Sequence, residues 1–343
     1  MILIDGKEAG GQVLRTAVGL SAITNKPIKV INIRGARGDG GLKTQHLEGI
    51  LAVGNLCNAK IKGAVLGSKE LEFIPGRIEP KQLNIKISTA GSIGLLFQSL
   101  QTISGFCGED IKINVYGGST SSAWSPTLHY IQNVFLPIAN KMGFSAEIKI
   151  IKEGFYPKGG AEVKMIIHPI KKLTPIKLTE RGKIKNIRGI SIVGSLPKHV
   201  AERQNEYAIK VLKEHGFDNI NISYQLVSTL SPGTSITIWA ECENSIIGAD
   251  NIGRRGVRAE KIGEECAKEL IASLESKAAL DKYMADQILV FLSLADGESE
   301  IRVEEITEHV RTNIKVIEQI VGVRFYVDED EKTIRVIGIG LMG

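Results

Sequence analysis

Apolar and polar residues follow two periods along the chain, and these periods alternate in a recurring order. Runs with a period of two are typical of strands, and longer stretches with an apolar residue every three or four positions are typical of helices. Three segments show the succession strand, helix, strand, helix, strand, strand. Because strands and helices alternate, we predict an α/β fold in which helices pack on sheets.

The three segments differ too much in length to form a regular solenoid. The predicted helices cover residues 10–24, 45–58, 92–105, 128–142, 277–295 and 310–321. The predicted strands cover residues 28–33, 60–63, 70–74, 84–88, 111–116, 146–152, 161–168, 300–303, 323–327 and 333–337, and a further strand precedes Gly6.

The third segment is interrupted. Its first strand is expected near residues 175–178, about a hundred residues before its first helix. The intervening residues have a pattern of their own, with strands at 186–193, 220–226 and 234–242 and helices at 200–214 and 257–274. We therefore predict three repeated β-α-β-α-β-β units in a large domain, residues 1–181 plus 277–343, and an inserted small α/β domain, residues 182–276.

Composition describes an ordinary soluble protein. Of the 343 residues, 43% are hydrophobic and 24% are charged, as in globular proteins of more than one domain. No apolar run approaches the roughly 20 residues that a membrane span needs, and the N-terminus does not have the pattern of a signal peptide. Cys57, Cys107, Cys242 and Cys266 lack metal-ligand spacing, so we expect buried thiols in a reducing, cytoplasmic setting. The net charge of +5 permits a polyanionic partner without demanding one.

Two glycine-rich motifs do not predict a nucleotide site. Residues 35–44 resemble a phosphate loop, but Leu42 separates the glycines from Lys43, whereas that loop needs glycine directly before Lys-Ser/Thr. Residues 338–343 match G-x-G-x-x-G, but no helix follows that would present its N-terminus to a pyrophosphate.

A polyphosphate site is indicated by the segment 5–15, which has the pattern strand, glycine turn, helix. Glycines let the backbone approach a ligand closely, and a helix N-terminus favours an anion. Glu8 could hold a metal ion there, and Arg15 lies one turn inside the helix. Arg34 and Arg37 follow the next strand and offer planar two-point grips on phosphate. The alternative, glycines that only form turns and arginines that are only solvated, stays open at this point.

His309 is the strongest single candidate for chemistry. It lies between a predicted strand and an apolar helix, and ligands collect at the ends of strands in α/β folds. The alternative interpretation is a solvated histidine at the start of a helix.

Seven motifs run in order along the chain: D-G-x-E-x-G-G-Q-V-L-R at 5–15, N-I-R-G-A-R at 32–37, Q-H-L at 45–47, G-F-Y-P-K-G-G at 154–160, H-V-A-E-R at 199–203, Y-M-A-D-Q at 283–287 and H-V-R-T-N at 309–313. Together they resemble the RNA 3′-terminal phosphate cyclase family over nearly the whole chain. The runs at 154–160 and 309–313 are the most specific. The fold implied by the resemblance, three repeated units plus an inserted small α/β domain, is the one that the periodicity predicts.

The resemblance implies a reaction that consumes ATP with Mg²⁺ or Mn²⁺. His309 would attack the α-phosphate and form a histidine-AMP adduct, and an RNA 3′-terminal phosphate would then take the AMP. The RNA-(3′)pp(5′)-A end would close to a 2′,3′-cyclic phosphate. The implied partner is therefore RNA that ends in a 3′-phosphate.

The resemblance also implies roles for other residues. Asp286 is expected to orient His309, and Glu8 is expected to hold the metal ion. The residues expected to bind ATP are Arg15, Arg34, Arg37, Gln45, Gln98, Trp124, Pro126, Tyr283 and Gln287. We expect the insert to be dispensable for self-adenylation. The oligomeric state stays open, with a homodimer as one option.

Two rival functions come from other classes. A non-catalytic cyclase-like protein that acts as a ribosome-assembly factor would lack the nucleophile, and His309 is present. An enolpyruvyl-transferase-like enzyme is suggested by the repeated unit alone, and no motif for a phosphoenolpyruvate site is found.

Overall fold

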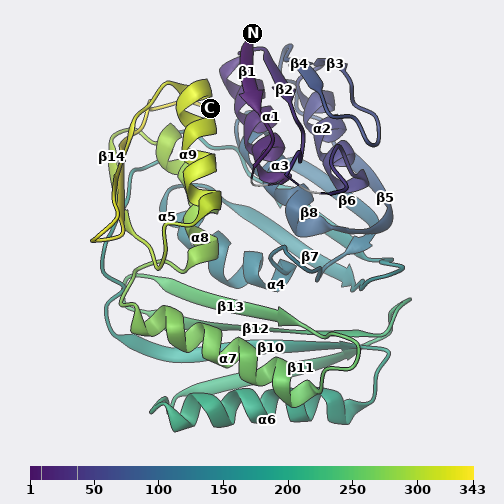
Figure 1. The fold of residues 1–343 in the computed structure, drawn as a ribbon, viewed down its shortest axis with the longest axis vertical. Helices are drawn as coiled ribbons and strands as arrows, with labels where there is room; N and C mark the ends of the chain where they lie inside the picture. Colours follow the sequence, from purple (N-terminus) through teal and green to yellow (C-terminus); the bar gives the residue numbers. More distant parts are fainter. Residues whose placement is uncertain (9, 37) are drawn as a thin grey trace.

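Three units of sheet and helix form one body, and a further sheet with two helices lies beside it (Figure 1). This arrangement comes from a computed structural model, which describes residues 1–8, 10–36 and 38–343. The first unit comprises β1 (Ile2–Asp5), α1 (Gln12–Thr24), β2 (Ile28–Ile31), α2 (Thr44–Leu56), β3 (Lys60–Lys62) and β4 (Leu71–Ile74). The second comprises β5 (Leu83–Ser92), α3 (Ile93–Gly105), β6 (Ile111–Ser119), the helical segments α4 (Leu128–Tyr130), η1 (Ile131–Phe135) and α5 (Leu136–Lys141), β7 (Ala146–Lys152) and β8 (Glu162–Ile167).

The third unit is split by the insert along the chain. It comprises β9 (Lys177–Leu178), α8 (Lys282–Leu294), β14 (Glu298–Arg302), α9 (Glu308–Val321), β15 (Phe325–Asp328) and β16 (Thr333–Ile337). The insert comprises β10 (Ile184–Gly194), α6 (Lys198–Glu214), β11 (Ile220–Val227), β12 (Gly233–Cys242), β13 (Ile246–Ile252) and α7 (Ala259–Glu275).

The three units share one sheet topology. Their strand orders are β1-β2-β4-β3, β5-β6-β8-β7 and β9-β14-β16-β15. In each, the first two strands are parallel and the other neighbours are antiparallel. The predicted α/β fold of three repeated units is therefore confirmed. The insert has a different order, β11-β10-β12-β13, and β13 was not predicted because its Gly248, Asp250 and Asn251 are unfavourable in strands.

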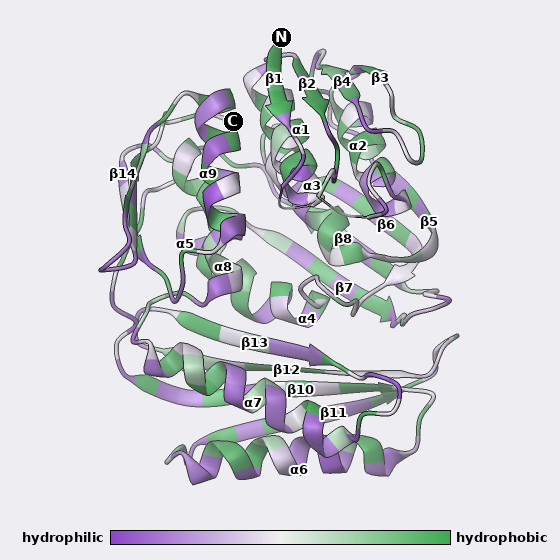
Figure 2. Ribbon diagram, viewed as in Figure 1, coloured by the Kyte–Doolittle hydropathy of each residue, from purple (hydrophilic) through white to green (hydrophobic). Residues whose placement is uncertain are grey.

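Helix boundaries differ from the predictions where a capping side chain intervenes. The Thr307 hydroxyl accepts a hydrogen bond from the Val310 backbone N–H at 3.2 Å, so α9 begins at Glu308 and includes His309 in its first turn. The Asp281 carboxylate likewise caps α8, which begins at Lys282 rather than 277. Figure 2 shows α9 with alternating hydrophilic and hydrophobic residues, as expected for a helix that buries one face.

Buried apolar side chains form two clusters. The larger runs through the three units and includes four phenylalanine rings in mutual edge or tilted contact, with centroids 5.0–6.4 Å apart: Phe97, Phe135, Phe144 and Phe291. The smaller lies within residues 187–274 of the insert. The exact domain boundaries at 182 and 276 stay a prediction, and Trp239 of the insert packs in the larger cluster. The four cysteines are buried free thiols, as expected. No helix in the described part of the chain is both long and apolar enough to cross a membrane.

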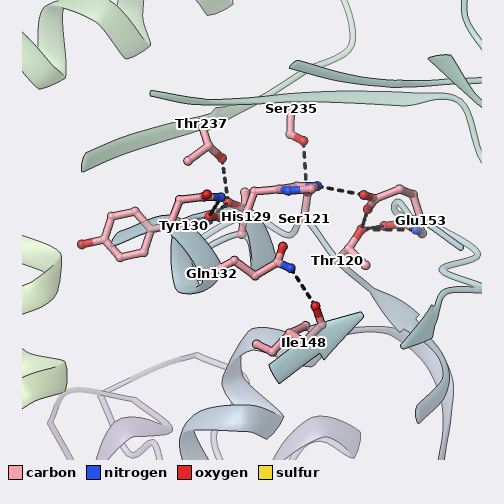
Figure 3. Close-up of polar contacts among 12 residues, drawn as sticks. Thr120, Ser121, His129, Tyr130, Gln132, Ile148, Glu153, Ser235 and Thr237 are labelled. Atoms are coloured by element: carbon pink, nitrogen blue, oxygen red, sulfur yellow. Dashed lines mark hydrogen bonds and ion pairs between the residues drawn. The ribbon is translucent and has the colours of Figure 1, made fainter. Parts of the chain in front are cut away.

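Buried polar side chains join the insert to the second unit. The Ser121 hydroxyl donates to the Ser235 hydroxyl at 3.0 Å, and this contact is drawn in Figure 3. The hydroxyls of Thr127 and Thr237 lie 2.9 Å apart. Beside them, Glu153 bridges the Thr120 hydroxyl and the His129 ring, with 2.9 Å to His129 Nε2. Because all of these side chains are buried, each bond lost would leave a polar group without water or a partner.

Asp281 joins the insert to α8 in the same way. It is 1% exposed and accepts hydrogen bonds from the Tyr130 hydroxyl at 2.6 Å and from the Gly248 backbone N–H at 3.1 Å. It also accepts from the backbone N–H groups of Tyr283 and Met284 at the start of α8. Burial raises the pKa of this carboxyl to about 6. The cap of α8 therefore depends in part on β13.

These contacts argue against a dispensable insert. Replacement of residues 182–276 by a short Gly/Ser linker is expected to leave several buried polar groups unpaired, at about 1–3 kcal/mol each. We expect a lower melting temperature and weaker self-adenylation, because α8, which contains Asp286, loses the contact between its capping residue Asp281 and Gly248. Thermal unfolding and labelling by α-labelled ATP measure the two effects. Full labelling of a stable deletion protein would restore the original expectation.

Candidate functional site

The candidate site lies where α1 and α9 begin beside α8. Gln12 is the first residue of α1, and His309 is the second residue of α9. Gln12 Oε1 lies 2.5 Å from His309 Nδ1, and Gln12 Nε2 donates to Asp286 Oδ2 at 2.8 Å. Three residues that are up to 297 positions apart in sequence thus form one hydrogen-bond chain.

The chain of hydrogen bonds selects one tautomer of His309. An ionised carboxylate only accepts hydrogen bonds, so the Gln12 amide must point its NH₂ group at Asp286. Its carbonyl oxygen then faces the ring, and His309 Nδ1 must carry a hydrogen and donate it. In the neutral ring the lone pair is consequently on Nε2.

This arrangement changes the role expected for Asp286. We expected its carboxylate to orient His309, whereas it holds Gln12, and Gln12 contacts the ring. Gln12 was not among the predicted site residues. The available signal was its position at the start of a helix after a glycine turn, where a polar side chain can face a ligand.

Burial sets the charge states around this chain. It raises the pKa of the Asp286 carboxyl to about 7, against the opposing effects of Arg15 and of the Gln12 hydrogen bond. It also lowers the pKa of Arg15 to about 10, against the attraction of Asp286. Arg15 is therefore still a cation at neutral pH, and Asp286 is poised between its two protonation states.

A small cavity of about 30 Å³ adjoins these groups. Its lining includes four predicted site residues, Arg15, Gln98, Asp286 and Gln287, and also Gln12. Arg15 Nε donates to Gln98 Oε1 at 3.1 Å, so α1 and α3 are joined at its wall. Gln101 also lines the cavity, and its buried side-chain oxygen has no hydrogen-bond partner among the residues that the structure describes. The space and the polar lining suit an ordered water.

Asn313 fastens the three helices together. It lies one turn after His309 on α9, and its Oδ1 accepts from the Thr16 hydroxyl at 2.6 Å. Its Nδ2 donates to the backbone oxygen of Asp286 at 2.7 Å. The H-V-R-T-N motif therefore supplies both the candidate nucleophile and the side chain that fixes its helix against α1 and α8.

His46 is a second residue without a predicted role. It is 6% exposed, and burial, followed by the charges of Arg15, Arg34 and Lys43, lowers its pKa to about 3. His46 Nδ1 accepts from the Lys43 backbone N–H at 3.2 Å, so the neutral ring carries its hydrogen on Nε2. A Cβ at Gly11 would lie 2.1 Å from His46 Nε2. Glycine is thus required at position 11 for the backbone to pass over this ring.

Arg34, Arg37 and Glu8 were predicted to form part of a polyphosphate site. Arg34 donates to the Asp39 carboxylate at 3.1 Å and to the Gly41 backbone oxygen at 3.2 Å, so it holds its own loop together. Arg37 lies outside the described residues. Glu8 is exposed in the turn before α1. Among the described residues, no cluster of three or more acidic, histidine or cysteine side chains forms a metal cage.

The other predicted site residues lie around the starts of α3 and α8. Gln45 Oε1 accepts from the Ser92 backbone N–H at 3.0 Å, directly before α3. The backbone oxygen of Pro126 also adjoins this helix, 2.7 Å from where a Cβ at Gly94 would lie. Trp124, in the same loop, is 98% exposed.

Tyr283 and Gln287 occupy the first turns of α8. The Tyr283 hydroxyl donates to Glu269 of the insert at 2.7 Å, and burial, with that hydrogen bond, raises its pKa. Gln287 Nε2 donates to the backbone oxygen of Tyr283 at 2.8 Å. Gln287 lines the cavity, whereas the Tyr283 hydroxyl contacts the insert.

Comparison with known proteins places the chain among its relatives. A family profile described as RNA 3′-terminal phosphate cyclase matches residues 6–327. The chain belongs to that family. Proteins named RNA 3′-terminal phosphate cyclase from Thermococcus onnurineus and Methanothermobacter thermautotrophicus are each 43% identical to it. The matches cover 98% of this chain and 99% of the first relative, and 96% of each chain for the second. A relative with the same name from Pyrobaculum aerophilum is 39% identical over 99% of both chains.

Membership of this family makes the chain an enzyme, because the relatives that it matches over nearly their full length are named as enzymes. The site described above lies within the residues that the profile matches, and it includes residues of two of the runs on which the resemblance was based. The run at 309–313 contains His309 and Asn313, and the run at 283–287 contains Asp286.

Proposed function

We propose that this cyclase-family chain uses ATP to convert an RNA 3′-terminal phosphate into a 2′,3′-cyclic phosphate. The observation that carries the proposal is the hydrogen-bond chain from Asp286 through Gln12 to His309. It puts the ring hydrogen on Nδ1 and the lone pair on Nε2, and an unprotonated imidazole nitrogen is the nucleophile that the reaction requires. The names of the relatives support the same reaction.

In the first step, His309 Nε2 attacks the α-phosphorus of ATP. A P–N bond forms, the bond to the β-phosphate oxygen breaks, and pyrophosphate leaves. Attack leaves the ring cationic, and the Gln12 oxygen and the Asp286 carboxylate then stabilise that charge. Arg15, a half-buried cation next to Asp286, would offset the negative charge of the phosphates.

In the second step, an oxygen of the RNA 3′-phosphate attacks the same phosphorus, and the P–N bond breaks. Neutral His309 is regenerated, and the RNA ends in a (3′)pp(5′)A group. In the third step, the 2′-oxygen attacks the 3′-phosphorus and loses its proton, and AMP leaves. The new five-membered ring on the terminal ribose contains the former 3′-phosphate, so the product is a 2′,3′-cyclic phosphate.

A divalent cation would fit this proposal if the protein and ATP each supplied some of its ligands. Mg²⁺ in nucleotide sites commonly takes one or two carboxylates, with phosphate oxygens and waters completing the shell. Glu8 is a single exposed carboxylate in the glycine turn before α1, so it would hold Mg²⁺ or Mn²⁺ together with the triphosphate. The bound ion would neutralise charge on the phosphates.

The rival functions account less well for the site. A ribosome-assembly factor without catalysis has no need for a histidine whose tautomer is selected by two further side chains. An enolpyruvyl transferase would share the repeated unit alone, and the chain matches the cyclase family over residues 6–327.

An RNA that ends in a 3′-phosphate is expected to be cyclised, whereas a matched RNA with a terminal 2′-deoxyribose 3′-phosphate should stop at the adenylated end. The first two steps use only the phosphate, and the third needs the 2′-hydroxyl. Intramolecular attack is worth about 7–11 kcal/mol of barrier, so attack by water on the deoxy species should be slow. Gel separation of the products formed with ATP and a divalent ion makes the measurement.

The ribo-ended substrate is the matched control for the deoxy-ended one. If the ribo end is ligated, hydrolysed to a free 3′-hydroxyl or left unchanged, the proposed function is wrong. A deoxy end that is never adenylated would remove the second step from the scheme.

A further inference from the structure

The outward face of the second unit's sheet is unlike those of the other two units. In β5, Leu83, Ile85 and Ile87 are buried, and Asn84, Lys86 and Ser88 point to solvent. Neighbouring strands continue this face in register. One row across the sheet is Asn84, Asn114, Lys164 and Lys149, and the next is Lys86, Tyr116, Glu162 and Lys152.

This face carries a basic excess that the protein does not neutralise. It presents five exposed lysines, Lys86, Lys112, Lys149, Lys152 and Lys164, beside the two acidic residues Glu147 and Glu162. Among the described residues, none of these five lysines has a carboxylate oxygen within 4.0 Å of its ammonium nitrogen. Lys149 and Lys164 are direct partners on β7 and β8. Like charges directly opposite each other destabilise a sheet, so this pairing favours an anionic ligand.

The other two units serve as internal controls, because their topology is the same. In the first sheet, Lys29 forms ion pairs with Glu70 at 3.0 Å and Glu72 at 3.6 Å. In the third sheet, Lys177 pairs with Glu300 at 3.3 Å. The repeated unit therefore does not require an unpaired basic face, and the second unit departs from the pattern of the other two.

Two further features of the face suit unstacked bases. Tyr116 lies on the second strand from the edge and is 45% exposed, with Lys86 beside it on β5. An exposed aromatic ring on a sheet is a platform on which a base can stack. The side-chain amides of Asn84 and Asn114 are joined at 2.8 Å and offer donors and acceptors to base edges.

The face also leads toward the candidate site. From Lys86, β5 continues to Ser92, and the paired stretch of β6 from Tyr116 to Ser119 covers three residues, about 10 Å at about 3.3 Å per residue. The Ser92 backbone N–H donates to Gln45, and α3, which follows, brings Gln98 to Arg15. Figure 1 labels the four strands of this sheet, β5, β6, β7 and β8. A chain of nucleotides bound along β5 and β6 would thus have one end near Ser92, at the end of β5 that adjoins the site.

We propose that this face binds the single-stranded RNA that precedes the reacting 3′-end, with lysines on its phosphates and Tyr116 stacked on a base. The proposal rests on the proposed function for the identity of the polyanion. The residues that would bind the RNA on this face lie outside the candidate functional site.

The test is a triple variant, Lys86→Gln, Lys149→Gln and Lys164→Gln, with Lys60→Gln, Lys62→Gln and Lys177→Gln as its matched control. The control removes the same charge from the equivalent faces of the first and third sheets. Binding of a twelve-nucleotide RNA with a 3′-phosphate is measured by fluorescence anisotropy across a range of salt concentrations. We expect about tenfold weaker binding for the test variant at 0.1 M salt and a logarithmic salt slope smaller by about 2, since each single-strand phosphate contact contributes about 0.7.

Tyr116→Leu is the second variant. It should weaken binding about tenfold without changing the salt slope, because stacking is not an ionic interaction. Unchanged affinity in both variants, or an equal loss in the matched control, would overturn the proposal. The anisotropy assay involves no turnover, and self-adenylation is measured alongside it. If the wild-type protein binds RNA through this face but does not cyclise it, the proposed function is wrong. The assignment of this face as an RNA-binding surface then still stands.

Discussion

The His309→Asn protein is expected to take up no covalent label from α-labelled ATP, at least about 1000-fold less than the wild type, as for loss of a nucleophile. An asparagine amide has no nitrogen lone pair available for attack on phosphorus. The fold should persist, because His309 is exposed and the cap of α9 is made by Thr307. The measurement is the labelled protein band after incubation with a divalent ion, together with a thermal unfolding curve.

The chain supplies a closely matched control in His199. Like His309, it is exposed and is the second residue of a helix, in this case α6 of the insert. His199→Asn should label as the wild type does. The bond formed on His309 should also be labile in acid and stable in alkali, as a phosphoramidate is. Undiminished labelling of His309→Asn would mean that the nucleophile lies elsewhere.

The repeated fold was predictable because it depends on hydrophobic periodicity, which is local in sequence. Each unit buries one face of each strand and one stripe of each helix, so the pattern along β5 or α9 already specifies which side is inside. Failures occurred where local preference and context disagree. β13 includes Gly248, Asp250 and Asn251 yet forms a strand, since Asp250 accepts the Thr127 backbone N–H at 2.7 Å and Gly248 leaves room for Val134.

The sequence pointed to several residues that line the candidate site, but not to the hydrogen bonds between them. Arg15, Gln98, Asp286 and Gln287 do meet at one cavity. Which of them contacts His309 depends on how α1, α8 and α9 pack, and residue types alone do not contain that information. Gln12 was therefore missed, and Arg34 was expected at phosphate although its side chain contacts Asp39 and Gly41.

Gln12→Met is expected to slow self-adenylation on the order of 100-fold, as loss of a residue that fixes a histidine tautomer does. Methionine has nearly the shape of glutamine but can neither accept from Nδ1 nor donate to Asp286. Without the relay, the ring should shift toward the tautomer with its hydrogen on Nε2, which cannot attack phosphorus. Gln12→Glu should recover part of the rate, because its carboxylate accepts from Nδ1.

The pH dependence separates this positioning role from simple packing. An ionised Asp286 can only accept from Gln12, and burial raises the pKa of this carboxyl to about 7. Below that pH the protonated carboxyl can donate to the Gln12 oxygen, which lets the amide turn its NH₂ group toward Nδ1 and puts the ring hydrogen on Nε2. The fraction of Nδ1–H tautomer, read from ¹⁵N shifts of labelled histidine, should thus rise with pH through about 7 in the wild type, together with the rate. In Gln12→Met the tautomer ratio should no longer follow Asp286, because the relay is gone. A tautomer ratio that is the same in both proteins at every pH would show that Gln12 only fills space.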